Sequence, residues 1–308
     1  MMVVGLVDID GHNYPNLALM KISAWHKSMG DTVSKKVNVD TIHRFDKVYM
    51  SKIFTFTEDK GKNFHSFKNI VIGGTGYNYE KLTEEVDKIC PDYSLYPEFV
   101  QAYGFLTRGC PNKCSWCIVP EKEGKIRPYM DVEEFLDGRK EVVLMDNNVL
   151  ASDFGLMQIE KCIKLNLKVD FNQGLDARII ANDLEIVKLL AKVRWKPCVR
   201  LACDSQNTKV YLRRAVTLLR KYGCTPKQYF VYVLLTEFED SYNRINFCKE
   251  LKLDAFAQPF RDFTQEQNIP QWQKDMARYT NRKQLYRTMD FKDYKPRKGF
   301  ICREYFKS

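Results

Sequence analysis

Apolar runs of strand length alternate with amphipathic segments of helix length along most of the chain. In the first part, residues 3–7, 48–56 and 70–72 are apolar enough for strands, and residues 17–25 have helical spacing that ends at Gly30. Alternation of this kind predicts a parallel sheet flanked by helices. Residues 78–97, which contain Pro91 and Pro97, predict a helix and a linker.

A longer and more regular series follows. Strands are expected at 102–108, 142–145, 168–172, 199–202, 228–235 and 255–260, and helices between them, for example at 183–192, 207–222 and 240–251. About six β/α units predict a partial barrel with ligands at the C-terminal ends of its strands. We therefore expect an α/β protein in three parts: a small Rossmann-like domain with its linker (1–97), a partial (β/α)6 barrel (98–265) and a basic, aromatic extension (266–308).

Composition places few limits on this picture. The 308 residues are 44% hydrophobic and 29% charged, as in an ordinary globular protein. No apolar run approaches the roughly 20 residues that span a bilayer, and the start lacks the pattern of a secretory signal. Ten cysteines without an export signal are typical of a reducing compartment. We expect a cytoplasmic protein without a membrane partner.

The net charge of +10 is concentrated in two segments. Residues 191–228 contain ten Lys or Arg against one acid, and residues 270–308 contain eleven against four. One interpretation is a phosphate-rich partner, a nucleic acid or a nucleotide. The other is solvated helix faces, with Leu212, Val216 and Leu219 facing inward. In the C-terminal segment, basic and aromatic residues either stack on bases or form a cap with cationic stems over rings.

The strongest chemical signal is three cysteines in one loop, Cys110, Cys114 and Cys117, spaced C-x3-C-x2-C directly after an apolar stretch. Three thiolates can hold three irons of a four-iron cluster and leave the fourth iron open. A structural zinc would need a fourth ligand nearby, but the next cysteine is Cys162 and no His follows His65. A disulfide between such close cysteines would stabilise little.

The spacing, with residues 104–108 before it and residues 118–120, Gly124 and Arg127 after it, resembles the radical S-adenosylmethionine (SAM) superfamily. The resemblance is to the branch that contains methylthiotransferases and cobalamin-dependent members. It implies a [4Fe-4S] cluster whose open iron chelates the amino and carboxylate groups of SAM. One electron then cleaves the sulfonium to a 5'-deoxyadenosyl radical, which takes a hydrogen from the substrate. It also implies a flavodoxin- or ferredoxin-like electron donor and a radical SAM type of barrel.

The first part of the chain resembles a shortened cobalamin-binding domain. That domain binds cobalamin through a D-x-H-x-x-G loop, whereas residues 8–12 read Asp-Ile-Asp-Gly-His, with the wrong spacing. We therefore expect no bound cobalamin, although His12 remains a candidate contact for substrate or phosphate. The Gly-Gly-Thr-Gly run at 73–76 is not spaced G-x-G-x-x-G and predicts a tight turn at the edge of the sheet.

Polar residues that follow the predicted barrel strands are the candidate ligands of SAM. Asp146, Asn147 and Asn148 stand where the family's G-G-E segment contacts the methionyl amine; an Asx turn would use the same residues. After the later strands, Asn172 and Gln173 are candidates for the ribose, and Arg178 for a carboxylate. Arg200 and Asp204 either bind ligand or pair with each other. The remaining candidates are Trp116 as a cover over the cluster, Cys203 as a hydrogen donor and Arg261 as a substrate contact.

Three functions remain open. The first is reductive SAM cleavage and hydrogen abstraction from an unidentified substrate, which includes nucleotides and nucleic acids. Methylthiotransfer is less favoured, because those enzymes carry three more cysteines upstream and this chain has only Cys90 before Cys110. The third is a nucleic-acid-binding protein with a structural metal site.

Overall fold

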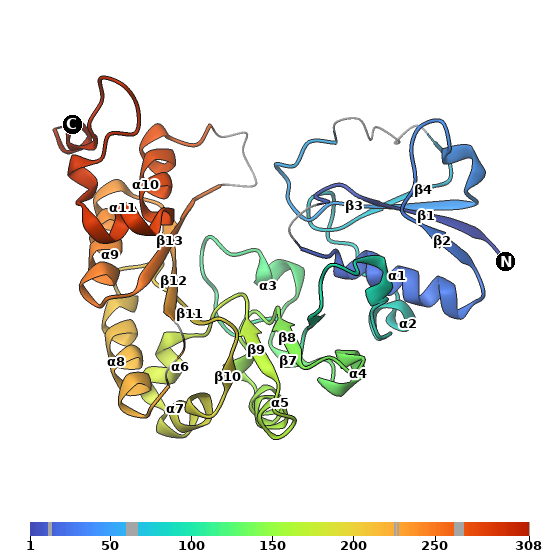
Figure 1. Cartoon of the computed structure of the whole chain (residues 1–308), viewed down its shortest axis with the longest axis horizontal. Helices are drawn as coiled ribbons and strands as arrows, with labels where there is room; N and C mark the ends of the chain where they lie inside the picture. Colours follow the sequence, from blue (N-terminus) through green and yellow to red (C-terminus); the bar gives the residue numbers. More distant parts are fainter. Residues whose placement is uncertain (12–13, 60–66, 225, 227, 262–267, 308) are drawn as a thin grey trace. The chain divides into compact units, whose positions relative to one another are not determined.

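The computed structural model describes residues 1–11, 14–59, 67–224, 226, 228–261 and 268–307 (Figure 1). The chain divides into two compact units. The first unit comprises Met1–Gly104 and Met130–Val142, and the second comprises Phe105–Tyr129 and Val143–Ser308.

A four-stranded parallel sheet of order β2-β1-β3-β4 forms the first unit. The strands are β1 (Val3–Asp8), β2 (Thr32–Ser34), β3 (Lys47–Ser51) and β4 (Ile70–Gly73). The helix α1 (Leu17–Ser28) starts where the side chain of Asn16 accepts a hydrogen bond from the Leu19 N–H. Short elements complete the unit: η1 (Ile42–Arg44), α2 (Glu84–Asp87), η2 (Tyr93–Leu95) and α4 (Glu133–Leu136).

Two predicted elements of this unit are shorter than expected. The strand predicted at 48–56 ends at Ser51, and a turn follows in which Thr57 N donates to Phe54 O at 3.2 Å. The helix predicted within 78–97 is limited to the four residues of α2, followed by the single turn of η2. The turn at 73–76 is confirmed: Gly74 has a φ of +94° and its carbonyl accepts from Tyr77 N and Asn78 N, after the edge strand β4.

Strands are present at each position expected after residue 102, although the one expected at 102–108 is divided in two, and its halves belong to different sheets. The strands are β5 (Ala102–Gly104) with β6 (Thr107–Arg108), β8 (Glu141–Leu144), β9 (Lys168–Phe171), β11 (Cys198–Ala202), β12 (Gln228–Leu235) and β13 (Asp254–Pro259). One sheet has the order β10-β9-β8-β5, with the short β10 (Arg194–Trp195) at its edge, and another has the order β11-β12-β13. A parallel bridge between Leu175 and Leu201 links the end of β9 to β11.

Helices alternate with these strands and cover them (Figure 1). They are η3 (Val149–Ala151), α5 (Asp153–Lys164), α6 (Ala177–Asn182), α7 (Leu184–Ala191), α8 (Thr208–Lys221) and α9 (Phe238–Glu250). The regular in-and-out pattern of β12 buries Tyr229, Val231, Val233 and Leu235. The structure thus confirms an α/β fold of parallel strands and intervening helices. No helix in the described ranges is long and apolar enough to cross a membrane.

The C-terminal segment forms α10 (Gln271–Asn281), α11 (Lys283–Thr288), η4 (Phe291–Asp293) and η5 (Cys302–Phe306). Its cations lie over aromatic rings, as the cap interpretation expects: Lys292 Nζ is 4.7 Å from the Phe306 ring centre, and the Arg297 guanidinium is 3.9 Å from that of Phe300. Basic and aromatic side chains of this segment therefore pack against each other within the second unit.

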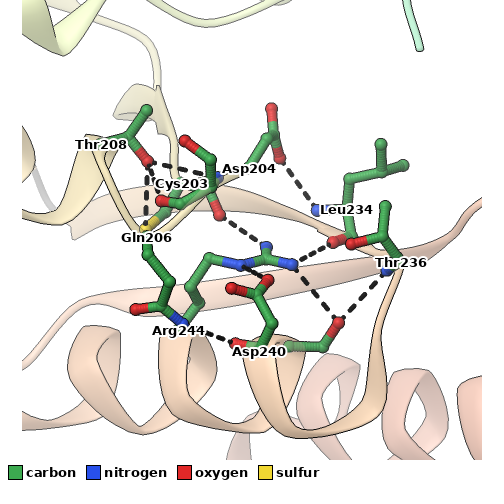
Figure 2. Close-up of polar contacts among 10 residues, drawn as sticks. Cys203, Asp204, Gln206, Thr208, Leu234, Thr236, Asp240 and Arg244 are labelled. Atoms are coloured by element: carbon green, nitrogen blue, oxygen red, sulfur yellow. Dashed lines mark hydrogen bonds and ion pairs between the residues drawn. The ribbon is translucent and has the colours of Figure 1, made fainter. Parts of the chain in front are cut away.

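A buried arginine joins the ends of two central strands (Figure 2). Arg244 of α9 is fully buried and donates to the carbonyls of Cys203, at 2.8 Å, and Leu234, at 2.9 Å. Its Nε donates to Asp240 Oδ2 at 2.6 Å. The guanidinium thus satisfies carbonyls where β11 and β12 end, and Asp240 balances its charge.

Candidate functional site

The cysteine loop is closed at its base by a short antiparallel pair. β6 pairs with β7 (Arg127–Pro128), with Arg108 opposite Arg127, and Cys110 N donates to Gly124 O at 3.2 Å. Gly109 starts the loop with a φ of +83°, and a Cβ at this position would lie 2.3 Å from the Lys125 carbonyl oxygen. Only glycine fits such a close approach of two backbones.

Glu123, at the end of the short helix α3 (Val119–Lys122), fixes the start of the same loop. Its carboxylate accepts from Gly109 N at 3.0 Å and from Asn147 Nδ2 at 2.8 Å, and lies 3.5 Å from Arg108. Asn147, predicted as a SAM ligand, therefore uses its amide nitrogen to connect the loop after β8 with the cysteine loop.

The three cysteines of the loop share one electrostatic environment. Cys110 and Cys114 are half-buried and Cys117 is exposed. Burial raises the pKa of Cys114 and of Cys117, and the neighbouring thiols of the loop raise both further. All ten cysteines lie within the described ranges, and none of them forms a disulfide.

Within the described residues, no group of three or more His, Cys, Asp or Glu side chains stands ready to hold one metal ion. A structural zinc needs its four ligands gathered around a single point. A four-iron cluster instead takes each cysteine at a different iron. The donor chemistry of three free thiols in one closed loop fits the ligand set of such a cluster.

Asp176 is the centre of the polar network beside the cysteines. It caps α6 by accepting from Arg178 N, and it binds the Arg178 guanidinium through both oxygens, at 2.8 Å and 2.7 Å. Its Oδ2 also accepts from Asn112 of the cysteine loop at 3.1 Å and from Asn148 at 3.2 Å. Burial raises the pKa of Asp176, but the hydrogen bonds from Arg178 and Asn112 and the charge of Arg178 outweigh it and hold that pKa below its usual value. Three loops, after β6, β8 and β9, thus meet at one carboxylate.

Sequence reasoning proposed Arg178 as the partner of a ligand carboxylate, whereas the structure gives it Asp176. The pKa of Arg178 is raised, mainly by its hydrogen bonds to Asp176. The thiols of Cys114 and Cys110 raise it further. The guanidinium is therefore a fixed positive charge near two of the three thiols. The central role of Asp176 was missed, although its position two residues before Arg178 was visible in the sequence.

An acceptor of this network, on Asn148, lacks a donor among the described residues. The residue is 3% exposed, and its Nδ2 donates to Asp176 and approaches Cys110 Sγ at 3.8 Å. Its Oδ1 is buried and has no hydrogen-bond partner in the part of the chain that the structure describes. A buried acceptor without a donor costs about 1–3 kcal/mol, so this oxygen favours a ligand that brings an N–H or O–H.

Asp146 has a structural role instead of a free carboxylate. It is 4% exposed and accepts from the backbone N–H groups of Leu106 and Thr107 and from the Thr107 hydroxyl. Burial raises its pKa to about 6, against the lowering effect of those hydrogen bonds. Asp146 therefore fixes the strand that leads into the cysteine loop, and both of its oxygens already accept hydrogen bonds.

The other charged candidates are also engaged. Arg200 forms a two-point ion pair with Asp170, at 2.7 Å and 2.8 Å, rather than with Asp204. Asp204 accepts from Leu234 N at 2.9 Å, and burial raises its pKa (Figure 2). The alternative in which these residues stabilise the strands is favoured, with Asp170 as the partner of Arg200.

The remaining candidates have fewer contacts with the network. Cys203 is fully buried, accepts from Thr208 Oγ1 at 3.7 Å and so packs in the core (Figure 2). Asn172 and Trp116 are half-buried, whereas Gln173 and Arg261 are exposed. The carbonyl of Asn172 accepts from the Tyr232 hydroxyl at 2.8 Å. His12 lies outside the described residues.

Comparison with known proteins adds no identification: neither a scan against protein-family models nor a search of curated proteins finds a match for this chain.

Proposed function

We propose that this chain is a radical SAM enzyme whose [4Fe-4S] cluster is held by Cys110, Cys114 and Cys117. The main support for the proposal is the arrangement of the cysteine loop, which contains three free thiols. Hydrogen bonds among Asn112, Asn148 and Asp176 fix this loop to the loops that follow β8 and β9. Under this proposal the parallel strands of the second unit form a partial barrel, with the cysteine loop at their C-terminal ends.

When bound, the cluster would supply one electron that cleaves SAM to a 5'-deoxyadenosyl radical, which takes a hydrogen atom from the substrate. The chain's own residues have simpler roles. The three thiolates bind iron, and Asn148 Oδ1 accepts a hydrogen bond from the ammonium group of SAM. Arg178 keeps a positive charge beside the anionic cluster and is itself oriented by Asp176.

The proposal also requires an electron donor of flavodoxin or ferredoxin type and a reducing compartment, which we take to be the cytoplasm. The single-zinc alternative, a nucleic-acid-binding protein with a structural metal, has no fourth ligand that the described residues bring to the loop. The methylthiotransferase alternative still lacks its upstream cysteines.

The test is anoxic reconstitution with iron and sulfide, followed by dithionite and SAM. The proposal expects 5'-deoxyadenosine from the wild-type chain and none from C114A. The matched control is C224A, because Cys224 is a buried cysteine outside the loop. Equal product from C114A and wild type would refute the assignment of the loop.

A further inference from the structure

The cations of the two basic segments differ in their partners. In the C-terminal segment, five of the eleven Lys and Arg side chains pair with carboxylates: Lys283 and Arg287 with Asp254, Arg297 with Asp275, Arg303 with Asp293, and Lys307 with Glu304. In residues 191–228, Arg200 pairs with Asp170. Seven other described cations of that segment have no carboxylate partner among the described residues: Lys192, Arg194, Lys209, Arg213, Arg214, Arg220 and Lys221. Like charges held together without acids are a cost to folding, which a bound polyanion would remove.

Four of these cations form one face of α8. The helix has 14 residues, no acid, and a length of about 21 Å. It buries Leu212, Ala215, Val216 and Leu219, as the sequence predicted for three of them, and it packs beside α6 and α7 (Figure 1). The opposite side is exposed and carries Arg213, Arg214, Arg220 and Lys221, which we call the α8 basic face.

Two of these side chains are held in place by the protein. The Arg213 guanidinium lies 4.9 Å from the centre of the Phe247 ring. Arg220 lies 5.2 Å from that of Tyr229 and donates to Leu251 O at 3.0 Å. Anchored cations lose less conformational entropy when they bind an anion, because part of their freedom is already lost.

Aromatic side chains flank the cations. Tyr211 is 37% exposed and Tyr222 is 36% exposed, at opposite ends of the α8 basic face. Next to Tyr222 in the sequence, Gly223 lines a hollow of about 350 Å³. Lys168, Arg194, Trp195 and Pro226 also line it. Exposed rings interleaved with cations are the combination that binds unpaired bases together with their phosphates.

We propose that the α8 basic face and the adjoining hollow bind the backbone of single-stranded nucleic acid, with unpaired bases stacked on Tyr211 and Tyr222. This inference rests on the proposed function, because it takes single-stranded nucleic acid to be the substrate of the proposed enzyme. Lys168 is the first residue of β9, whereas Asp176 and the cysteine loop belong to the other end of that strand. A polymer bound at one end of the strand can extend to the other end, toward the cysteine loop. Duplex is less favoured, because its bases are not free to stack on tyrosine.

The test is fluorescence anisotropy with labelled single-stranded RNA and DNA 30-mers of mixed sequence and with the matching duplex, between about 50 and 200 mM salt. We expect the single strands to bind more tightly than the duplex. The variant R214E/K221E should weaken binding at least tenfold and make the slope of log affinity against log salt shallower by about 1.4, or about 0.7 for each phosphate that is no longer neutralised. Y211A/Y222A should weaken binding about tenfold and leave that slope unchanged.

The matched control is K274E/R278E, which makes the same change of charge at two exposed α10 residues without carboxylate partners among the described residues. It should keep more than half of the wild-type affinity. Equal losses in both charge variants, tighter binding of duplex, or no binding at low salt would each overturn the inference. A chain that makes 5'-deoxyadenosine but binds no single strand refutes only this inference, and a chain that binds single strands but holds no iron refutes only the proposed function.

Discussion

The amide of Asn148 donates from Nδ2 to Asp176 Oδ2 at 3.2 Å, and its buried Oδ1 has no donor among the described residues. If that oxygen receives the ammonium of SAM, N148A should weaken SAM binding to the reconstituted protein about tenfold or more, since a lost hydrogen bond to a charged group costs about 1.5–3 kcal/mol. Titration calorimetry measures this. N182A is the control, because Asn182 is an exposed residue of α6 whose amide donates to Arg178 O. An unchanged dissociation constant in N148A would remove Asn148 from the site.

Two glycines of the cysteine loop share a left-handed backbone but differ in their surroundings. A Cβ on Gly109 would lie 2.3 Å from the Lys125 carbonyl oxygen, whereas a Cβ on Gly124, whose φ is +77°, would have nothing within 4 Å. G124A should cost only the backbone term, about 1 kcal/mol, because strain of this size is typical of a left-handed non-glycine residue. G109A should cost more, since the backbone must also move, and should lower iron content after reconstitution. Urea unfolding and iron analysis of both variants test this; equal behaviour would mean that the close approach is unimportant.

The buried carboxyl of Asp146 predicts a pH dependence of stability. Its pKa is raised from 3.8 to about 6 in the folded chain, mainly by burial. Between these values the folded state binds more protons than the unfolded state, so this group's contribution to the free energy of unfolding falls as pH rises from about 4 to 6 and is level above that. The shift corresponds to about 3 kcal/mol.

The measurement is urea unfolding of wild type and D146N at several pH values, because the difference isolates Asp146 from carboxyls such as Asp176, whose pKa is lowered. The stability of wild type relative to D146N should decline between pH 4 and 6. A difference that stays constant over this interval would show that folding does not raise the pKa of Asp146.

Arg244 predicts a large loss of stability on truncation. Its guanidinium satisfies the carbonyls of Cys203 and Leu234 and pairs with Asp240. R244A should lower the free energy of unfolding by about 3–5 kcal/mol, because several buried polar groups lose their partner at once. R244K should recover little, since an ammonium group cannot donate in the planar fork that Arg uses. R214A, an exposed change on α8, is the control, and a similar small loss in both would contradict this role.

The strands of the second unit were predictable, because each is a compact apolar run between polar turns. β11, β12 and β13 begin and end within a residue or two of the expected positions. The end of β3 was not predictable from the sequence, because Phe54 and Phe56 continue the apolar pattern. In the structure these two rings stack on each other in the turn, at 5.2 Å between ring centres. Local pattern does not distinguish a ring that packs in a sheet from a ring that packs in a loop.

The cysteine loop was readable from spacing alone, but the network that supports it was not. Asp176 and Arg244 are ordinary charged residues in the sequence, and their importance comes from contacts with residues 64 and 41 positions away, Asn112 and Cys203. From the sequence, Asp146 was a candidate for either a ligand or an Asx turn because it follows a strand, whereas in the structure it accepts from the backbone N–H groups of Leu106 and Thr107. The ends of strands indicate where a site lies. Only the tertiary contacts distinguish residues that can bind a ligand from residues that hold the loops in place.

The most direct test of the central claim is the iron and acid-labile sulfide content of the anoxically reconstituted chain, with C110A, C114A and C117A measured in parallel. The account predicts about four irons and four sulfides per wild-type chain, and loss of most of both in each variant. A wild-type chain that binds no iron, or that instead holds one zinc ion, would contradict it.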